Sequence, residues 1–275
     1  MNNTQFINLT SLANIDLIGE GVTQFLDGQL SINTNSLRFE KAKLACFCNH
    51  KGRIVALFHI VLIENGVRLI LPTSTLDFAI SHIKKYSVFF KVETTSNTTQ
   101  LSGVCCDNIS VLEQSNLINI DQTNLVLAVS DPGSNSRSDT NEGDDSFWFT
   151  ELALNKIAWL GEDTVEHFLP HSLNLPDLGA VDFKKGCFTG QEVIARMQYK
   201  GKLKQHLHRL TSNDDEVINN KQKLYQDEKS IGEVVCCVNQ GKNNSAILAL
   251  IKDSANLSKQ FQTSPENSPI LEISS

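Results

Sequence analysis

Apolar and polar positions recur with two different periods along the first part of the chain. A helix is expected where four side chains follow a three- and four-residue spacing, namely Val22, Phe25, Leu26 and Gln29. The runs KLACFC and RIVALFHIVLI, which come next, have the composition of strands. Asn65-Gly66 then predicts a two-residue hairpin turn, and the return strand is expected over 67–71.

A second helix is expected directly after this hairpin. Ser74 and Asp77 form an S-x-x-D start that resembles a capping box, and one apolar face follows with Leu76, Ile80 and Ile83. The run SVFFKVE, residues 87–93, reads as a further strand. Helices that pack on antiparallel strand pairs predict an α+β fold.

The second half of the chain divides into a polar loop and a region of strands. Residues 131–145, DPGSNSRSDTNEGDD, contain no apolar side chain and are expected to form a long mobile loop. Past Gly201 the runs KLKQHLHRL, KSIGEVVCCV and SAILALI are strands without a clear helix. A small all-β domain is therefore expected over 201–275, with a frayed tail from Ser264.

Composition restricts the class of protein. The 275 residues are 40% hydrophobic, which is enough for a sizeable core, and the formal net charge is −7. No basic and apolar leader opens the chain, and the longest apolar stretch, 54–63, is too short to span a bilayer. The seven cysteines are odd in number and lie mostly in strand-like runs, which favours a reducing cytoplasm.

The stretch FKKGCFTGQE, residues 183–192, carries the candidate chemistry. Thr189 and Glu192 have the T-x-x-E spacing of a capping box, with Phe188 and Val193 at the positions of a hydrophobic staple. Gly190 would allow a close approach to the backbone, and the helix is expected to end at Gly201.

Cys187 would then lie just outside the N-terminus of a helix. Free amides, the helix dipole and the neighbouring Lys184 and Lys185 would all favour the thiolate. A cysteine in a turn is more often a small packed residue, so a structural role stays open. No metal site is expected because no C-x-x-C spacing occurs, and a single thiolate does not hold an iron–sulfur cluster within one chain.

A basic stretch continues from this turn. Seven Lys and Arg stand against one acid between Lys184 and Arg209, in a chain that is acidic as a whole. A solvated face is the usual outcome of such a run. Because it adjoins a helix start, a ligand with carboxylates or phosphates is the competing interpretation.

FKKGCFTGQE resembles the signature K-G-C-[YF]-x-G-Q-E of the folate-binding YgfZ family, within the superfamily of the glycine cleavage T-protein. Three more segments match family patterns in the right order: CNHKGRI, KKYSVFFKV and FLPHSLNL. The resemblance covers roughly residues 17–208. It implies a cloverleaf of ferredoxin-like α+β subdomains and a C-terminal β-barrel around a central folate cavity. Residues 1–200 would supply two such subdomains.

The resemblance also implies the site residues. The signature residues carried over are Lys185, Gly186, Cys187, Phe188, Gly190, Gln191 and Glu192, with Lys184 and Thr189 completing the turn. Trp148 falls where the family has a tryptophan implicated in folate binding, and Asn174 matches the Asn of the FLPHSLNL pattern. A tryptophan at this place would stack on a pterin or, equally, pack in the core. The implied cofactor is tetrahydrofolate, and Cys187 would be the functional thiol.

Two functions follow from this resemblance. One is a folate-binding accessory protein for iron–sulfur enzymes, including those that methylthiolate tRNA. The other is a tetrahydrofolate-dependent aminomethyl or methyl transferase. The T-protein carries its carboxylate in G-G-I-x-D-D, whereas this chain has Ala56 and Leu57 at the two acidic positions, so the accessory function is preferred.

A third reading, direct tRNA binding, finds little support. Aromatic residues make up 7% of the chain and no basic–aromatic alternation is present. The expected partners are therefore folate and iron–sulfur proteins, with no nucleic acid and no membrane, and the expected state is a monomer.

Overall fold

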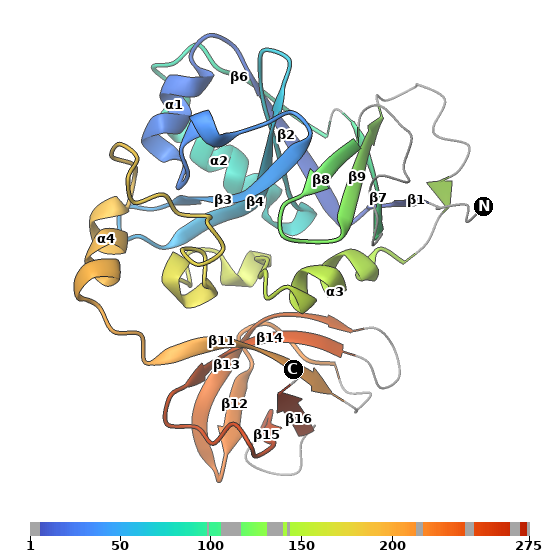
Figure 1. Ribbon diagram of the computed structural model, residues 1–275, viewed down its shortest axis with the longest axis vertical. Coiled ribbons are helices and arrows are strands. Elements are labelled where there is room, and N and C mark those ends of the chain that lie inside the picture. Colours follow the sequence, from blue (N-terminus) through green and yellow to red (C-terminus); the bar gives the residue numbers. More distant parts are fainter. Residues whose placement is uncertain are drawn as a thin grey trace.

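The computed structural model describes residues 6–97, 99–105, 117–130, 140–141, 144–212, 217–239, 245–264 and 270–273. A large mixed sheet with helices lies above a closed barrel, and α3 together with the following segment lies between them (Figure 1). The fold class is α+β with a C-terminal barrel, as predicted.

The first half of the sheet forms around the predicted helix and hairpin. Helix α1 spans Val22–Gln29 and buries the four residues expected from their spacing. Asn65, at φ 62°, turns the chain between the two hairpin strands. The strands are β2 (Leu12–Ile18), β3 (Lys41–Cys48), β4 (Ile54–Ile63), β5 (Gly66–Pro72) and β6 (Glu93–Ser96), with α2 (Leu76–Ser87) and the 3-10 turns η1 (Thr34–Ser36) and η2 (Thr73–Thr75).

The second half of the sheet continues from β3. Strand β8 pairs in parallel with β3, so one ten-stranded sheet runs in the order β10-β1-β7-β9-β8-β3-β4-β5-β2-β6. Its further strands are β1 (Phe6–Asn8), β7 (Gln100–Cys105), β8 (Leu117–Ile120), β9 (Leu125–Ser130) and β10 (Thr140–Asn141). Helix α3 (Ser146–Leu154) follows, with the 3-10 turns η4 (Glu162–Thr164) and η5 (Pro170–Leu173).

The C-terminal strands close into a barrel in the order β11-β14-β13-β12-β15-β16. Successive side chains along one strand point alternately into the barrel and toward its outer face. Ile247 and Ala249 belong to the interior cluster, whereas Leu248 and Leu250 join the cluster around α3. The strands are β11 (Gln205–Ser212), β12 (Lys223–Gln226), β13 (Lys229–Asn239), β14 (Ser245–Lys252), β15 (Phe261–Gln262) and β16 (Ile270–Ile273).

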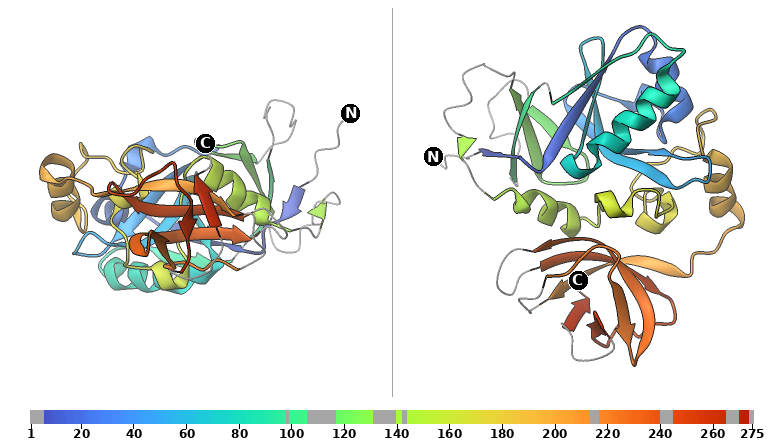
Figure 2. Two further views of the ribbon diagram at one scale, coloured as in Figure 1. Left: turned by 90° about the horizontal axis from the view of Figure 1, so that it is seen from below. Right: turned by 180° about the vertical axis from the view of Figure 1, so that it is seen from behind.

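A large apolar core lies on each side of the sheet. Phe25, Phe47 and Phe58 centre the core under α1 and α2. The other core lies under α3 and continues into the outer face of the barrel. Figure 2 shows α2 across the face of the sheet opposite the side seen in Figure 1. The helices and barrel thus bury both faces of the central strands.

Three local predictions were wrong. Helix α2 begins after Thr75 without a side-chain cap, so Ser74 and Asp77 do not form a box. The run SVFFKVE is not a strand: α2 extends to Ser87, Phe89 is 95% exposed, and β6 begins only at Glu93. The expected frayed tail includes β16, which pairs with β11 and β15 and closes the barrel.

The predicted mobile loop 131–145 falls mostly outside the described residues. Within it, Asp145 is fixed by the N–H and hydroxyl of Ser11, at 2.7 and 3.0 Å. The division of the chain at residue 201 and the two subdomains before it stay predictions. Among the described helices none is long and apolar enough to span a membrane.

Candidate functional site

A cleft of about 960 Å³ opens where the sheet, α2 and the barrel approach one another. Its walls are the turn between β3 and β4, the outer face of α2, the segment from Glu162 to Ser172, and two barrel residues, Gln205 and Glu233. A volume of this size falls within the range of small-molecule and cofactor sites.

Three of the quoted sequence segments line this one cleft. CNHKGRI supplies Lys51 and Arg53, KKYSVFFKV supplies Lys85 and Tyr86, and FLPHSLNL supplies Phe168. They are far apart in the chain and come together because β4 follows the turn, α2 flanks it, and Ile54 accepts and donates backbone hydrogen bonds with the 166–168 segment. Phe78 adds a second aromatic ring to the wall.

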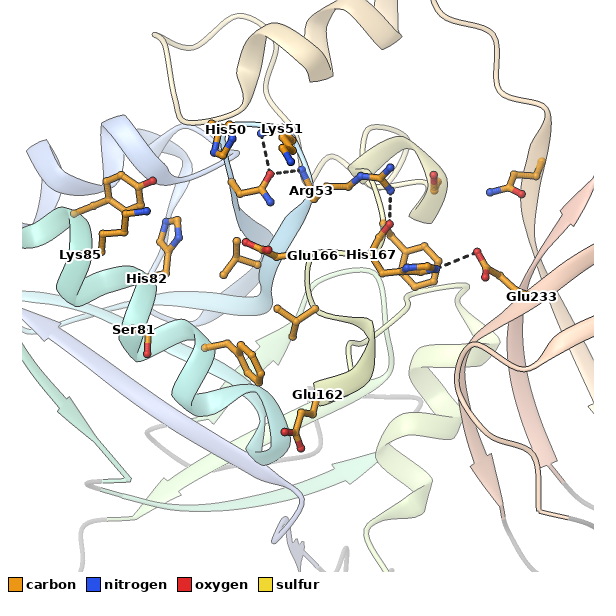
Figure 3. A pocket seen from close by; sticks show the side chains of 18 residues that line it. His50, Lys51, Arg53, Ser81, His82, Lys85, Glu162, Glu166, His167 and Glu233 are labelled. Atoms are coloured by element: carbon orange, nitrogen blue, oxygen red, sulfur yellow. Dashed lines mark hydrogen bonds and ion pairs between the residues drawn. The ribbon is translucent and has the colours of Figure 1, made fainter.

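The cleft is lined by both cations and hydrogen-bond acceptors. Figure 3 shows Lys85 and His82 on α2, with Glu166 on the facing segment. Glu166 has a φ of 57°, in the left-handed region that costs a non-glycine residue free energy. Its backbone N–H donates to Ile54 O at 2.8 Å, which holds this conformation.

Glu233 connects the barrel to the cleft wall. Its carboxylate lies 3.3 Å from His167 Nε2 and 2.8 Å from Lys223 Nζ (Figure 3). Burial alone would raise the pKa of Glu233, but Lys223 and His167 lower it overall. Arg53 Nη1 donates to the carbonyl of His167, so the same segment is fixed from the sheet side.

His82 is the buried imidazole of the cleft. Its ring stacks on Phe47 at 5.0 Å and 12°, and Nε2 lies 3.0 Å from Gln29 Oε1. Burial and, to a lesser extent, the nearby Lys85 lower the pKa of His82 to about 4, so the ring is neutral at pH 7.

The signature turn packs behind this cleft. Gly190 has a φ of 85°, and a Cβ at this position would lie 2.5 Å from Asn49 O and 3.0 Å from Gly52 Cα. Gly52 has a φ of 70°, and a Cβ at this position would lie 3.1 Å from Val193 Cβ and 3.4 Å from Gly190 O. Glycine is needed at both positions because the backbones approach so closely. The β3–β4 turn thus has the cleft on one side and the signature turn on the other.

The predicted capping box in the signature is wrong. Helix α4 spans Gln191–Lys200 and begins one residue later than expected, with Gly190 as its N-cap and no side-chain bond. The Thr189 hydroxyl instead lies 3.2 Å from Gln29 Oε1, and the Thr189 N–H donates to Gly28 O. Tertiary contacts with α1 therefore replace the local cap. The predicted end of the helix at Gly201 is confirmed.

The predicted staple fails with the shift of the helix start. Phe188 is buried in the core beneath α3, whereas Val193 is 37% exposed and meets Gly52.

Lys185 also points to α1. Its ammonium donates to Leu30 O at 2.5 Å and Asp27 O at 3.2 Å, at the C-terminal end of that helix. Cations stabilise this end of a helix dipole. Burial lowers the pKa of Lys185, and the carboxylates of Asp27 and Asp182 oppose that shift. The ammonium also lies over the ring of Phe188 at 5.2 Å.

The remaining signature residues lie at the surface. Cys187, Lys184, Gly186 and Glu192 are exposed, and Gln191 is half-buried. Because α4 begins at Gln191, Cys187 lies further from the helix N-terminus than expected, and Lys185 is engaged elsewhere. Among the other cysteines, Cys105 is also exposed, Cys237 is half-buried, and Cys46, Cys48 and Cys236 are buried, while Cys106 lies outside the described residues.

Trp148 and Asn174 lie apart from this cleft. Trp148 is 1% exposed and packs in the core against Gly103, and it borders an apolar space of about 20 Å³ with Leu57 and His59. None of the residues lining that space comes from the signature turn. Asn174 adopts φ 55° after η5 and turns the chain there, a backbone conformation that asparagine tolerates.

None of the candidate ligand residues taken from the signature lines the cleft. The residues missed by the sequence analysis are Glu166, His82 and Glu233. The left-handed conformation of Glu166 and the register that brings Glu233 to His167 carry no local sequence signal. His82 lay in the predicted helix, but on its apolar side.

The comparisons with known proteins agree with this architecture. The chain is 28% identical over 289 residues to the tRNA-modifying protein YgfZ of Buchnera aphidicola, covering 90% of this chain and 87% of that one. The tRNA-modifying protein YgfZ of Vibrio atlanticus is 25% identical over 236 residues, covering 80% of this chain and 73% of that one. The resemblance to the YgfZ family is confirmed. No family model matches the chain.

A solved structure shows the same fold. The chain superimposes on aminomethyltransferase T of the glycine cleavage system from Bartonella henselae with a TM-score of 0.76. The match covers 99% of this chain and 86% of that structure, at 12% identity. The predicted T-protein-like fold is therefore confirmed.

Among the described residues, no cluster of three or more His, Cys, Asp or Glu side chains could hold a metal ion.

Proposed function

We propose that this protein binds a reduced folate, tetrahydrofolate, in the cleft between the sheet, α2 and the barrel. The observation that carries the proposal is the convergence of three family-like segments on that one cleft, with the signature turn packed behind it.

The chemistry of the cleft suits a folate. The 2-amino and ring N–H groups of a pterin need acceptors, which Glu166 provides, and its ring can pack on Phe78 or Tyr86. The carboxylates of the glutamate tail need cations, which Lys51 and Lys85 provide at the rim. Trp148 is too enclosed to stack on a pterin in this arrangement.

In the cell, we propose that the folate-bound protein supports iron–sulfur enzymes, including those that methylthiolate tRNA. The relatives are named tRNA-modifying proteins, which supports a role in tRNA modification. Cys187 is exposed on the signature turn, where a client protein can reach it, so it is proposed as the functional thiol.

The alternative function, a tetrahydrofolate-dependent transferase, would need the carboxylate of the T-protein pattern, which this chain lacks at the matching positions. Leu57, at the second acidic position of the T-protein pattern, is 2% exposed and lines the small space beside Trp148. That space has no carboxylate in its lining, so the acid that the T-protein pattern supplies has no counterpart there.

Calorimetric titration with tetrahydrofolate tests the binding site. Lys85→Gln should weaken binding about tenfold, because it removes one charge-assisted contact to a carboxylate. Lys184→Gln is the matched control, since it removes the same charge from an exposed position outside the cleft. Equal affinity of both variants, or no heat of binding to the unmodified protein at millimolar folate, contradicts the proposal.

A further inference from the structure

Gln29 connects the signature turn to the cleft. It is the last residue of α1, is 9% exposed, and lies between two polar side chains. Its Oε1 is 3.2 Å from the Thr189 hydroxyl and 3.0 Å from His82 Nε2. Thr189 belongs to the signature, and His82 lines the cleft.

The hydrogen bond between Gln29 Oε1 and His82 Nε2 selects one tautomer of the His82 ring. An amide oxygen can only accept, so the Thr189 hydroxyl and His82 Nε2 both donate to it. A neutral imidazole carries a single N–H, which leaves Nδ1 as an acceptor. The stack on Phe47 and the contact with Tyr86, at 4.7 Å, keep the ring from turning.

His82 Nδ1 is therefore the ring nitrogen that can accept a hydrogen bond from a ligand. No hydrogen bond to it occurs within the described part of the chain. His82 stands beside the cleft on α2, across from Glu166 (Figure 3). The cleft therefore offers two acceptors to a ligand that carries N–H groups.

We infer that Gln29 is a positioning residue, which with Thr189 holds His82 as the neutral Nε2–H tautomer so that His82 Nδ1 accepts a hydrogen bond from an N–H group of the cleft ligand. The inference rests on the proposed function for the identity of that ligand. It gives the signature turn a role in the cleft although no signature residue lines it.

The tautomer can be measured without any ligand. In ¹⁵N-histidine NMR at pH 7, His82 should appear as the Nε2–H form, and Gln29→Ala should convert it to a mixture of both tautomers. Gln29→Glu keeps an acceptor oxygen and should keep Nε2 protonated. A wild-type spectrum with the Nδ1–H form, or an unchanged spectrum in Gln29→Ala, overturns the inference.

The effect on binding is measured by titration with tetrahydrofolate. Gln29→Ala should weaken binding about tenfold, and Gln29→Glu should restore most of it. The matched control is Gln198→Ala, because Gln198 Oε1 makes the same contact with His171 Nε2, at 3.1 Å, away from the cleft. Near-ultraviolet circular dichroism checks that each variant folds.

The outcomes separate the two claims. A wild-type protein that binds no folate overturns the proposed function and the ligand assigned to His82, while the NMR result still decides the tautomer. A wild-type protein that binds folate, with Gln29→Ala binding as tightly as wild type or weakened no more than Gln198→Ala, overturns the inference alone.

Discussion

His59 is a fully buried imidazole in β4 whose Nε2 has no hydrogen-bond partner in the described part of the chain. Burial lowers the pKa of His59 to about 4, against about 6.5 in an unfolded chain. Between these values the unfolded state binds more protons, so stability is full above pH 6.5 and is lost as the pH falls toward 4. Because of His59 alone, the free energy of unfolding should be about 2 kcal/mol lower at pH 5 than at pH 8.

His59→Leu should remove that dependence. The difference in unfolding free energy between pH 8 and pH 5, measured by urea denaturation, should shrink by about 2 kcal/mol. His206→Gln is the control, since His206 is half-exposed in its ion pair with Asp253 and should change the difference little. An unchanged pH dependence in His59→Leu would show that His59 is not buried in the neutral form.

Cys187 is expected to be the thiol that function requires. In cells lacking the endogenous factor, Cys187→Ala should fail to restore an iron–sulfur tRNA-modifying enzyme, measured by the methylthiolated tRNA that the cells contain. Cys105→Ala should restore it, although that cysteine is exposed as well. Full complementation by Cys187→Ala would leave the signature a structural role only.

At the scale of elements, the packing of the signature turn requires glycine at position 190 but not at position 186. Gly190→Ala should destabilise the protein by about 1–3 kcal/mol, because of its positive φ and the 2.5 Å approach of a Cβ to Asn49 O. Gly186→Ala is the control in the same signature, since nothing lies within 4 Å of its Cβ and it should be nearly neutral. Thermal unfolding of both variants tests this, and equal melting temperatures would argue against the close packing of the two turns.

Helices and strands with a clear periodicity of apolar residues could be predicted from the sequence, but the residues at which the helices begin could not. The spacing of Val22, Phe25 and Leu26 predicted α1, and Asn65-Gly66 predicted the hairpin. Both capping boxes failed, because Thr189 bonds to Gln29 and α2 begins from a 3-10 turn. SVFFKVE failed because its aromatic residues lie in a turn after α2 rather than in the sheet.

At the scale of the whole molecule, the sequence located segments that line the candidate cleft, whereas the signature residues that it named as candidate ligands do not line it. CNHKGRI, KKYSVFFKV and FLPHSLNL were singled out, and they line the cleft. The candidate ligands were instead taken from the signature, which lies behind the wall. Which side of a turn faces a cavity depends on tertiary packing, such as the contact between Gly52 and Gly190, and no local pattern reports it.

The central claim is that a reduced folate occupies the cleft between the sheet, α2 and the barrel. A crystal structure of the protein with 5-formyltetrahydrofolate tests it most directly. We expect ligand density in the cleft, with the pterin N–H groups at Glu166 and His82 and the glutamate carboxylates near Lys51 and Lys85. Density beside Trp148 or on the outer face of the signature turn, or a cleft that stays empty at saturating ligand, would contradict the account.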